Sequence, residues 1–186
     1  MDKCIARFQG RAKETTIIPG KLIPIGFKIW VIAQKGYFLQ WIWHRKGAGN
    51  GPIGVCIPRE LGGTKKEGKG GNKTQATIVA LLERLPPLKE GRYHVFLDNL
   101  FTSKKLLHYL RSRGWGATGI ARTNSGVVSE LIDIKKMDRR MDNQPWGTLH
   151  AIPTQSNQVN QIGWKDNAYT LVQTTVYQGE PSAIVI

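Results

Sequence analysis

Two aspartates, Asp2 and Asp98, have the residue type and the sequence positions that a divalent-metal site would use. Asp98 follows a β-forming run at residues 93–97, so its carboxylate should leave a sheet at the C-terminal end of a strand. Two-metal phosphoryl transfer needs several carboxylates that hold two cations about 3.5–4 Å apart, and Mg²⁺ prefers oxygen ligands. A lone aspartate at a strand end is more often a turn former or a helix cap, so both interpretations stay open.

The histidines and cysteines predict no second site. The four histidines are scattered, without an HExxH-like arrangement or a triad partner. Cys4 and Cys56 lack CxxC spacing, so neither a zinc site nor a disulfide framework is indicated. We expect structural histidines and reduced thiols.

The chain is strongly basic, and its charge favours a polyanionic partner. Lys and Arg number 27 against 13 Asp and Glu, which gives a net charge of +14 and a pI near 10.0. Nucleic acid is the first candidate, and a basic ribosomal or secreted protein is the alternative that charge alone leaves open. Basic segments at 64–73 and 135–140 could follow phosphates, and a solvated basic loop is an equally weighted alternative. The candidate nucleic-acid-binding residues are Lys65, Lys66, Lys69, Lys73, Arg122, Lys135, Lys136, Arg139 and Arg140.

Two aromatic and β-branched runs, at residues 27–33 and 37–44, predict an antiparallel hairpin around a short loop containing Gly36. Trp30, Trp41 and Trp43 lie in these runs and could stack on bases, although packing in the sheet is favoured. Residues 46–73 are rich in Gly, Lys and Pro and predict a mobile basic loop.

Apolar spacing then predicts a helix over residues 74–85 with Thr74 as N-cap, and a second helix that begins at Ser103 and ends at Gly114. Strands are predicted at 93–97 and 116–121. This order of elements is typical of an α/β fold, with a mixed sheet flanked by helices.

Beyond Arg122 the pattern changes, and short β-strands are predicted at 148–152, 161–164 and 168–177. We therefore expect a core at residues 1–122 and a small β-rich insertion domain at 123–186. The sequence shows no signal peptide, and its apolar runs are too short to span a bilayer, which predicts a soluble intracellular protein without a membrane partner.

The segment at residues 96–103, FLDNLFTS, is similar to the D-N-[FWY]-[FY]-T-S signature of piggyBac-type DDE transposases. Residues 1–11 resemble the D-E-x-[ML]-x-x-F-x-G-R block of that family, with Lys3 in place of the usual Glu. Residues 24–30 and 117–124 resemble two further blocks in the same order.

The resemblance implies an RNase H-like core in which Asp2 and Asp98 are the first two catalytic, metal-binding aspartates. It also implies Mg²⁺ or Mn²⁺ as cofactor, DNA as substrate in cleavage and strand transfer, a homodimer, and a nuclear location if the source is eukaryotic.

The family's third catalytic Asp lies in a G-V-D-x-x-D-type motif after the insertion, and none of the 186 residues is assigned to it. We expect the first strand to be clipped, with Asp2 disordered for lack of a strand to hold it, and the chain to be inactive alone. Two alternatives are a DNA-binding module without catalysis and an unrelated nuclease that uses Asp2, Asp98 and an acidic residue of the tail.

Overall fold

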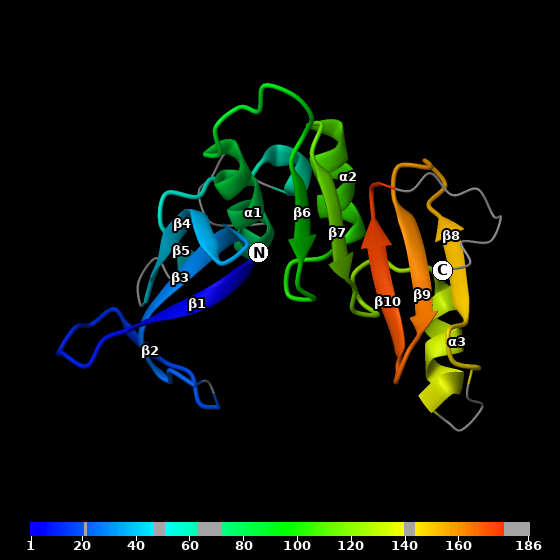
Figure 1. Cartoon of the computed structure of the whole chain (residues 1–186), viewed down its shortest axis with the longest axis horizontal. Coiled ribbons are helices and arrows are strands. Elements are labelled where there is room, and N and C mark those ends of the chain that lie inside the picture. Colours follow the sequence, from blue (N-terminus) through cyan, green and yellow to red (C-terminus); the bar gives the residue numbers. More distant parts are fainter. Residues whose placement is uncertain (21, 47–50, 63–71, 140–143, 177–186) are drawn as a thin grey trace. The chain divides into compact units, whose positions relative to one another are not determined.

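The computed structural model describes residues 1–20, 22–46, 51–62, 72–139 and 144–176 (Figure 1). Contacts between residues divide the chain into two compact units, Met1–Pro87 and Leu88–Ile186. Among the helices of the described ranges, none combines the length and the apolar character that a membrane crossing requires.

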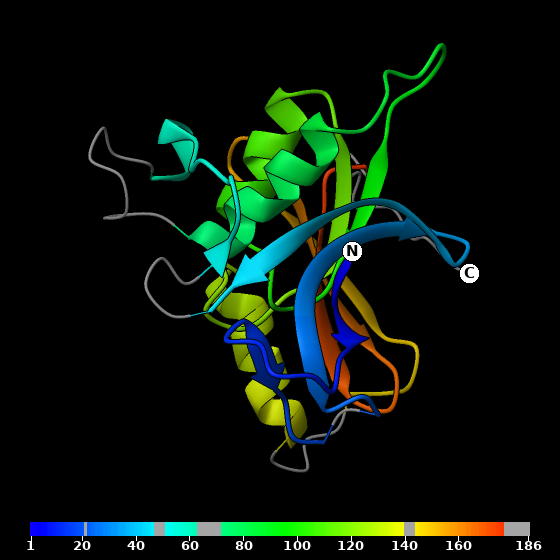
Figure 2. The same cartoon turned by 90° about the vertical axis from the view of Figure 1, so that its left-hand side faces the viewer.

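The first unit is built on an antiparallel sheet with the strand order β1-β3-β4-β5, and β2 pairs with β3 (Figure 2). The helix α1 packs against β3 and β4. The elements of this unit are β1 (Asp2–Arg7), β2 (Thr15–Ile17), β3 (Ile25–Gln34), β4 (Tyr37–Arg45), β5 (Gly51–Pro52), the 3-10 helix η1 (Arg59–Leu61) and α1 (Lys73–Glu83).

The predicted hairpin is confirmed, since β3 and β4 pair antiparallel and Trp30 lies opposite Ile42. Both of these side chains are buried. The predicted α1 helix is also confirmed, but its cap differs. The side chain of Asn72, not of Thr74, is the N-cap, and it accepts a hydrogen bond from the backbone N–H of Thr74 at 2.9 Å.

The expectation that Asp2 lacks a strand is wrong. Asp2 is the first residue of β1, and it lies opposite Val31 in an antiparallel pairing with β3 that continues to Arg7. The β-branched and aromatic residues of β3 give β1 a long partner strand, and this pairing fixes the backbone of Asp2. The Asp2 side chain is exposed, and its Oδ1 accepts a hydrogen bond from the Lys3 N–H at 2.7 Å.

The second unit is built on a mixed sheet with the strand order β6-β7-β10-β9-β8. β6 and β7 are parallel, and the remaining neighbours are antiparallel. Its elements are β6 (His94–Leu97), α2 (Lys104–Ser112), β7 (Gly116–Ile120), α3 (Ser129–Arg139), β8 (Leu149–Pro153), β9 (Asn160–Lys165) and β10 (Tyr169–Thr174).

Side chains alternate between a buried and an exposed face in this sheet, as the period of a β-strand requires. On β6, Val95 and Leu97 are buried whereas Phe96 is 69% exposed. α2 contacts β7 and β10, and α3 contacts β9 and β10. Leu106 of α2 and Leu131 of α3 are fully buried. The core of the unit therefore lies between the sheet and these two helices.

The α/β class is confirmed, with the strands distributed over two sheets. The strands predicted beyond Arg122 correspond to β8, β9 and β10. However, the sequence predicted only strands there, and the structure places α3 at Ser129–Arg139. Its buried face includes Leu131 and Asp138, seven residues apart and so on the same side of a helix, but a polar residue on that face weakens the apolar pattern. The domain boundary near Thr123 stays a prediction.

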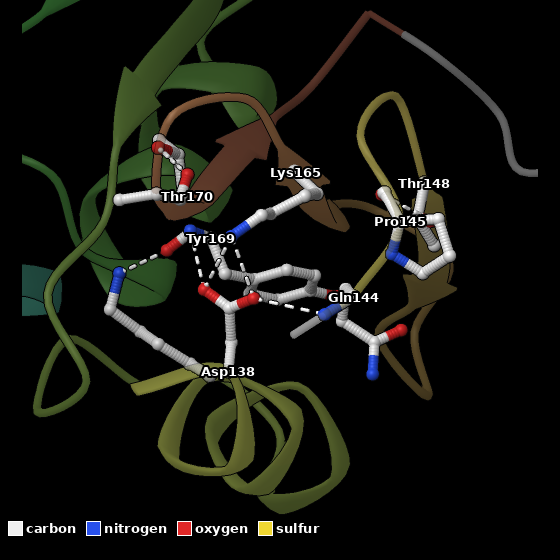
Figure 3. Close-up of polar contacts among 9 residues, drawn as sticks. Asp138, Gln144, Pro145, Thr148, Lys165, Tyr169 and Thr170 are labelled. Carbon is white, nitrogen blue, oxygen red and sulfur yellow. Dashed lines mark hydrogen bonds and ion pairs between the residues drawn. The ribbon is translucent and has the colours of Figure 1, made fainter. Parts of the chain in front are cut away.

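Asp138 anchors α3 to the sheet through a buried polar network (Figure 3). Its two carboxylate oxygens accept hydrogen bonds from Lys165 Nζ at 2.8 and 3.0 Å, and the backbone N–H groups of Gln144 and Tyr169 donate to it at 3.1 and 3.2 Å. The Asp138 and Lys165 side chains are only 6% and 12% exposed. The hydrogen bond from Lys165 lowers the pKa of Asp138.

Tyr169 extends this network toward β8. Its hydroxyl lies 2.8 Å from His150 Nδ1, and its backbone carbonyl accepts a hydrogen bond from Lys135 Nζ. Burial and the nearby Asp138 charge raise the pKa of Tyr169 to about 12, so the phenol is neutral at physiological pH. Through Lys165, Tyr169 and His150, this network links Asp138 of α3 to β9, β10 and β8.

We predict that Asp138→Asn lowers the midpoint of thermal unfolding by several degrees, because it leaves the Lys165 ammonium buried without its counter-charge. Asp133→Asn is the matched control. Asp133 forms an ion pair with Lys136 at 2.8 Å on the same helix, but those side chains are 56% and 62% exposed, so its loss should change the midpoint little. Circular dichroism of both variants measures the difference.

The same comparison has a pH dependence. Because the folded-state pKa of Asp138 is lowered, its stabilising contribution is complete above about pH 4 and is lost as the pH falls through the folded-state value. At pH 5–7 the Asp138 carboxylate is ionised, because this range begins about one unit above the ordinary pKa of Asp. The difference in midpoint between wild type and Asp138→Asn should therefore be largest there and shrink below about pH 4. A difference that is independent of pH would contradict the ion-pair account.

Candidate functional site

The parallel pairing of β6 and β7 brings two polar loops to one edge of the second sheet. Leu97 lies opposite Gly119, so the loop that begins at Asp98 and the loop that contains Arg122 both leave the sheet at the C-terminal ends of these strands. In α/β sheets with parallel strands this is the edge at which ligands usually bind. The structure thus places Asp98 where such a site is expected.

The backbone of Asp98, and not its carboxylate, closes the turn between β6 and α2. Its carbonyl oxygen accepts hydrogen bonds from Phe101 N at 3.0 Å, Thr102 N at 3.3 Å and Thr102 Oγ1 at 3.1 Å. Ser103 then caps α2 by accepting a hydrogen bond from Leu106 N at 3.2 Å. The residues of the DNLFTS segment therefore have local structural roles that leave the Asp98 side chain exposed.

The Asp98 carboxylate has coordination capacity to spare. Its Oδ1 accepts a hydrogen bond from Asn99 N at 2.6 Å, and Oδ2 accepts none from the described residues. An exposed carboxylate with one uncommitted oxygen can bind a divalent cation. Within the described ranges, however, no group of three or more His, Cys, Asp and Glu side chains is arranged to hold a metal ion.

Arg122 joins the two loops next to Asp98. Its Nη2 and Nε donate to Asn99 Oδ1 at 2.9 and 3.3 Å. Ser125 fixes the backbone of Arg122, because its N–H and its hydroxyl donate to the Arg122 carbonyl at 3.0 and 2.5 Å. The Arg122 guanidinium is therefore bound to Asn99, the residue that follows Asp98 in the sequence. The sequence predicted Arg122 as a nucleic-acid contact, but no local pattern could reveal its pairing with a residue 23 positions earlier.

Two buried glutamines on neighbouring strands form hydrogen bonds with the backbone of the Arg122 loop. Gln161 of β9 and Gln173 of β10 are directly opposite each other, and their exposed fractions are 1% and 0%. Gln161 Oε1 accepts a hydrogen bond from Val128 N at 2.8 Å, and Gln173 Nε2 donates to Ser125 O at 3.5 Å. Strands from the predicted insertion thus position a loop at the candidate site, a contribution that sequence reasoning missed.

Close packing at Gly119 completes this edge. A Cβ atom at Gly119 would stand 2.2 Å from Thr102 Oγ1 and 2.9 Å from the Leu97 carbonyl oxygen. Only glycine allows the strand β7 to approach the turn after β6 so closely. Gly119 of the ATGIA segment is therefore needed for the packing of β7 against the Asp98 turn.

The remaining predicted residues lie elsewhere. Asp2 belongs to the first unit and Asp98 to the second, and their shared role stays a prediction. Lys73 is the first residue of α1. Lys135 donates to the Tyr169 carbonyl, and Lys136 pairs with Asp133. Arg139 ends α3. Predicted contacts that lie outside the described residues are Lys65, Lys66, Lys69 and Arg140.

The three tryptophans of the hairpin are placed differently. Trp30 is buried, as packing in the sheet requires, and its Nε1 lies 3.3 Å from His44 Nδ1. Trp41 and Trp43 are 45% and 41% exposed, and their rings meet edge to face with centroids 5.0 Å apart. The expectation of sheet packing is thus confirmed for Trp30, whereas the other two reach the surface.

Known proteins are similar to this chain in sequence and in fold. The family described as Transposase IS4 matches residues 1–178. Human PiggyBac transposable element-derived protein 2 is 28% identical over 167 residues, which cover 87% of this chain and 24% of the relative. A cryo-EM structure of the piggyBac transposase synaptic complex with hairpin DNA matches with a TM-score of 0.67 at 18% identity, over 99% of this chain and 34% of that chain.

The match over residues 1–178 defines the class, and the chain belongs to the Transposase IS4 family. Within this family it resembles the piggyBac-type members, because the curated relative and the solved structure are both of this type. The RNase H-like α/β fold is therefore established. The chain spans about a quarter of the length of the curated relative and about a third of the solved one.

We predict that Gln161→Leu destabilises the chain by about 1–3 kcal/mol, because the half-buried N–H of Val128 loses its acceptor. Hydrogen exchange should accelerate at residues 125–128 and at the Lys104 amide, which donates to the Ser125 carbonyl. Gln155→Leu is the control, since Gln155 is exposed in the turn between β8 and β9. Unchanged exchange in the Arg122 loop would show that the glutamine does not hold it.

Proposed function

We propose that this chain carries two carboxylates, Asp2 and Asp98, of a DDE transposase core whose reaction is metal-dependent DNA cleavage and strand transfer. The observation that carries the proposal is that the Asp98 carboxylate is exposed and is not needed to form the turn. Its carbonyl oxygen forms the turn that a strand-end aspartate would otherwise form with its side chain. The carboxylate is left exposed at the edge where parallel strands end.

The donor set is appropriate for Mg²⁺ or Mn²⁺, although the described residues of neither unit make a complete site by themselves. Asp98 offers oxygen atoms, which these cations prefer, and Asp2 is the second ligand that we propose for them. When bound, the cations would activate the attacking oxygen and stabilise the leaving oxygen of a phosphodiester. The chain's own contribution is to hold Asp98 on the β6–α2 turn and to bind the Arg122 guanidinium to the side chain of the next residue, Asn99.

Charge supports DNA as the substrate. The net charge of +14 attracts a polyanion, and Arg122 presents a cation at the edge where Asp98 is exposed. The piggyBac transposase that shares this fold was solved as a synaptic complex with hairpin DNA. On this basis we also propose a homodimer as the working form and, in a eukaryotic cell, a nuclear location.

We further propose that the 186-residue polypeptide binds DNA without completing the reaction. The acidic residues that the structure describes beyond Arg122 have other partners, among them Glu130, which accepts a hydrogen bond from the Ser129 hydroxyl. Asp133 pairs with Lys136, and Asp138 is enclosed by Lys165 and two backbone N–H groups. Asp166 accepts a hydrogen bond from Trp146. These contacts argue against the unrelated nuclease that would use a tail carboxylate as its third ligand.

The second candidate function is a DNA-binding module without any catalytic role. The excess of basic residues favours it, and it shares with the first proposal the expectation of DNA binding. The two differ at Asp98, because a binding module has no need of a divalent cation at that residue.

The test uses the full chain with a labelled DNA duplex and with supercoiled plasmid. We expect binding at low salt that weakens steeply as salt is raised, because phosphate contacts release counterions. We expect Mg²⁺ to strengthen this binding in wild type and in the control Asp133→Asn, but not in Asp98→Asn. Plasmid nicking should stay at the level of the buffer.

Three outcomes decide between the proposals. Absence of duplex binding at low ionic strength would remove both. Binding that does not respond to Mg²⁺ in any variant would favour the module without catalysis. Plasmid nicking that Asp98→Asn abolishes would overturn the proposal that the polypeptide does not complete the reaction.

A further inference from the structure

A groove of about 360 Å³ lies at the opposite edge of the second unit's sheet, away from Asp98. It is formed where β6 and β7 begin and where α2 ends, and its lining includes Arg92, His94, Arg111 and Trp115. The length of β6 separates it from Asp98, which corresponds to roughly 13 Å for four residues of strand. The groove is therefore not part of the candidate site described above.

Arg111 provides a fixed cation on the wall of this groove. Its Nη1 donates to two backbone carbonyls, Thr175 O at 2.6 Å and Gln158 O at 3.2 Å. These bonds join α2 to the ends of the neighbouring chain segments and hold the guanidinium in one orientation. A preorganised guanidinium loses little conformational entropy when its remaining N–H groups bind an anion.

Arg92 adds a second cation, and none of the described residues that line the groove has a carboxylate. Within the described residues, Arg92 forms no hydrogen bond or ion pair. Its guanidinium lies against Gly114, with Nη1 2.9 Å from the position that a Cβ would take. Two arginines in one groove without a counter-charge repel each other, so an anion between them would be favourable.

The end of α2 does not account for these arginines. Cations often lie near the last turn of a helix because its carbonyl groups are unsatisfied. Here the turn is closed by its own backbone, with Gly114 N donating to Arg111 O and Trp115 N to Leu110 O, each at 2.9 Å. Arg92 also precedes β6 and is not part of the helix. The groove thus retains cationic donors that the helix end does not use.

The remaining wall is aromatic. Trp115 is half-buried, and the Arg113 guanidinium lies 5.8 Å from the centroid of its ring. His94 Nε2 lies 3.1 Å from Thr118 Oγ1, and burial lowers the pKa of His94, so the charge at neutral pH comes from the arginines. Arginine next to an aromatic ring is a combination that binds the phosphate and the base of a nucleotide.

We propose that this groove is a second contact for nucleic acid, in which the Arg92 and Arg111 guanidinium groups bind a phosphodiester of a DNA strand and Trp115 packs against an adjoining base. Guanidinium forks match the oxygen atoms of a phosphate. A strand held here contacts the protein away from Asp98, so this binding needs no divalent cation.

The experiment measures the affinity of the full chain for a labelled single-stranded oligonucleotide over a series of KCl concentrations, in EDTA. Arg92→Gln should reduce the slope of log K against log[salt] by about 0.7, the value for one lost phosphate contact on a single strand. Lys105→Gln is the control, since it removes the same charge from an exposed position of α2 outside the groove lining. Its slope should equal that of wild type.

Equal slopes for Arg92→Gln and wild type would overturn the proposal, and so would an equal reduction in both variants, which would show a general charge effect. An interaction with inorganic phosphate but not with the oligonucleotide would show that the groove binds a free anion and would also overturn it. Circular dichroism checks that both variants are folded. Because EDTA removes divalent cations, these outcomes are independent of whether Asp98 binds a metal.

Discussion

The parallel pairing of β6 with β7 is the constraint on which the candidate site depends. It places the Asp98 turn and the Arg122 loop at the same edge of the sheet, although 24 positions separate the two residues in the sequence. The pairing is tight because Gly119 leaves room for Thr102. Once these loops are neighbours, the hydrogen bonds from Arg122 to Asn99 join them. An exposed carboxylate and a guanidinium then share one small surface.

The second half of the chain supports this edge from within the same sheet. β10 pairs with β7, and β9 pairs with β10, so the strands predicted as an insertion extend the sheet that carries Asp98. Gln161 and Gln173 connect these strands to the Arg122 loop. The buried pair of Asp138 and Lys165 fixes α3 against the outer strands. Loss of one of these buried polar contacts should therefore alter the position of the loop that carries Arg122.

Local sequence patterns predicted the elements that have strong periodicity. The hairpin of β3 and β4, the helices α1 and α2, and the strand that ends at Asp98 follow from alternation, helical spacing and turn residues. The α3 helix was missed because its buried face ends in Asp138, whose partner Lys165 is 27 residues away. A strand for Asp2 was not expected either, because its stability comes from pairing with β3 and not from its own sequence.

The candidate site was predictable only in part. Motifs singled out Asp98 and Asp2 through residue type and order, and their shared role stays a prediction. The partners that position the Asp98 edge could not be found in this way. The contacts of Arg122 with Asn99 and of Gln161 with Val128 join residues that are far apart in the sequence. Such contacts depend on strand order, which local patterns in a single sequence do not reveal.

The most direct test of the central claim is paramagnetic broadening of the amide NMR signals of the ¹⁵N-labelled chain by substoichiometric Mn²⁺. Binding at the proposed carboxylates predicts broadening at Lys3 and at Asn99 to Thr102, retained in Asp133→Asn and lost at both places in Asp98→Asn. Sharp signals at these amides, with broadening confined to other acidic residues such as Asp133, would contradict the proposal that Asp2 and Asp98 are ligands of a divalent cation.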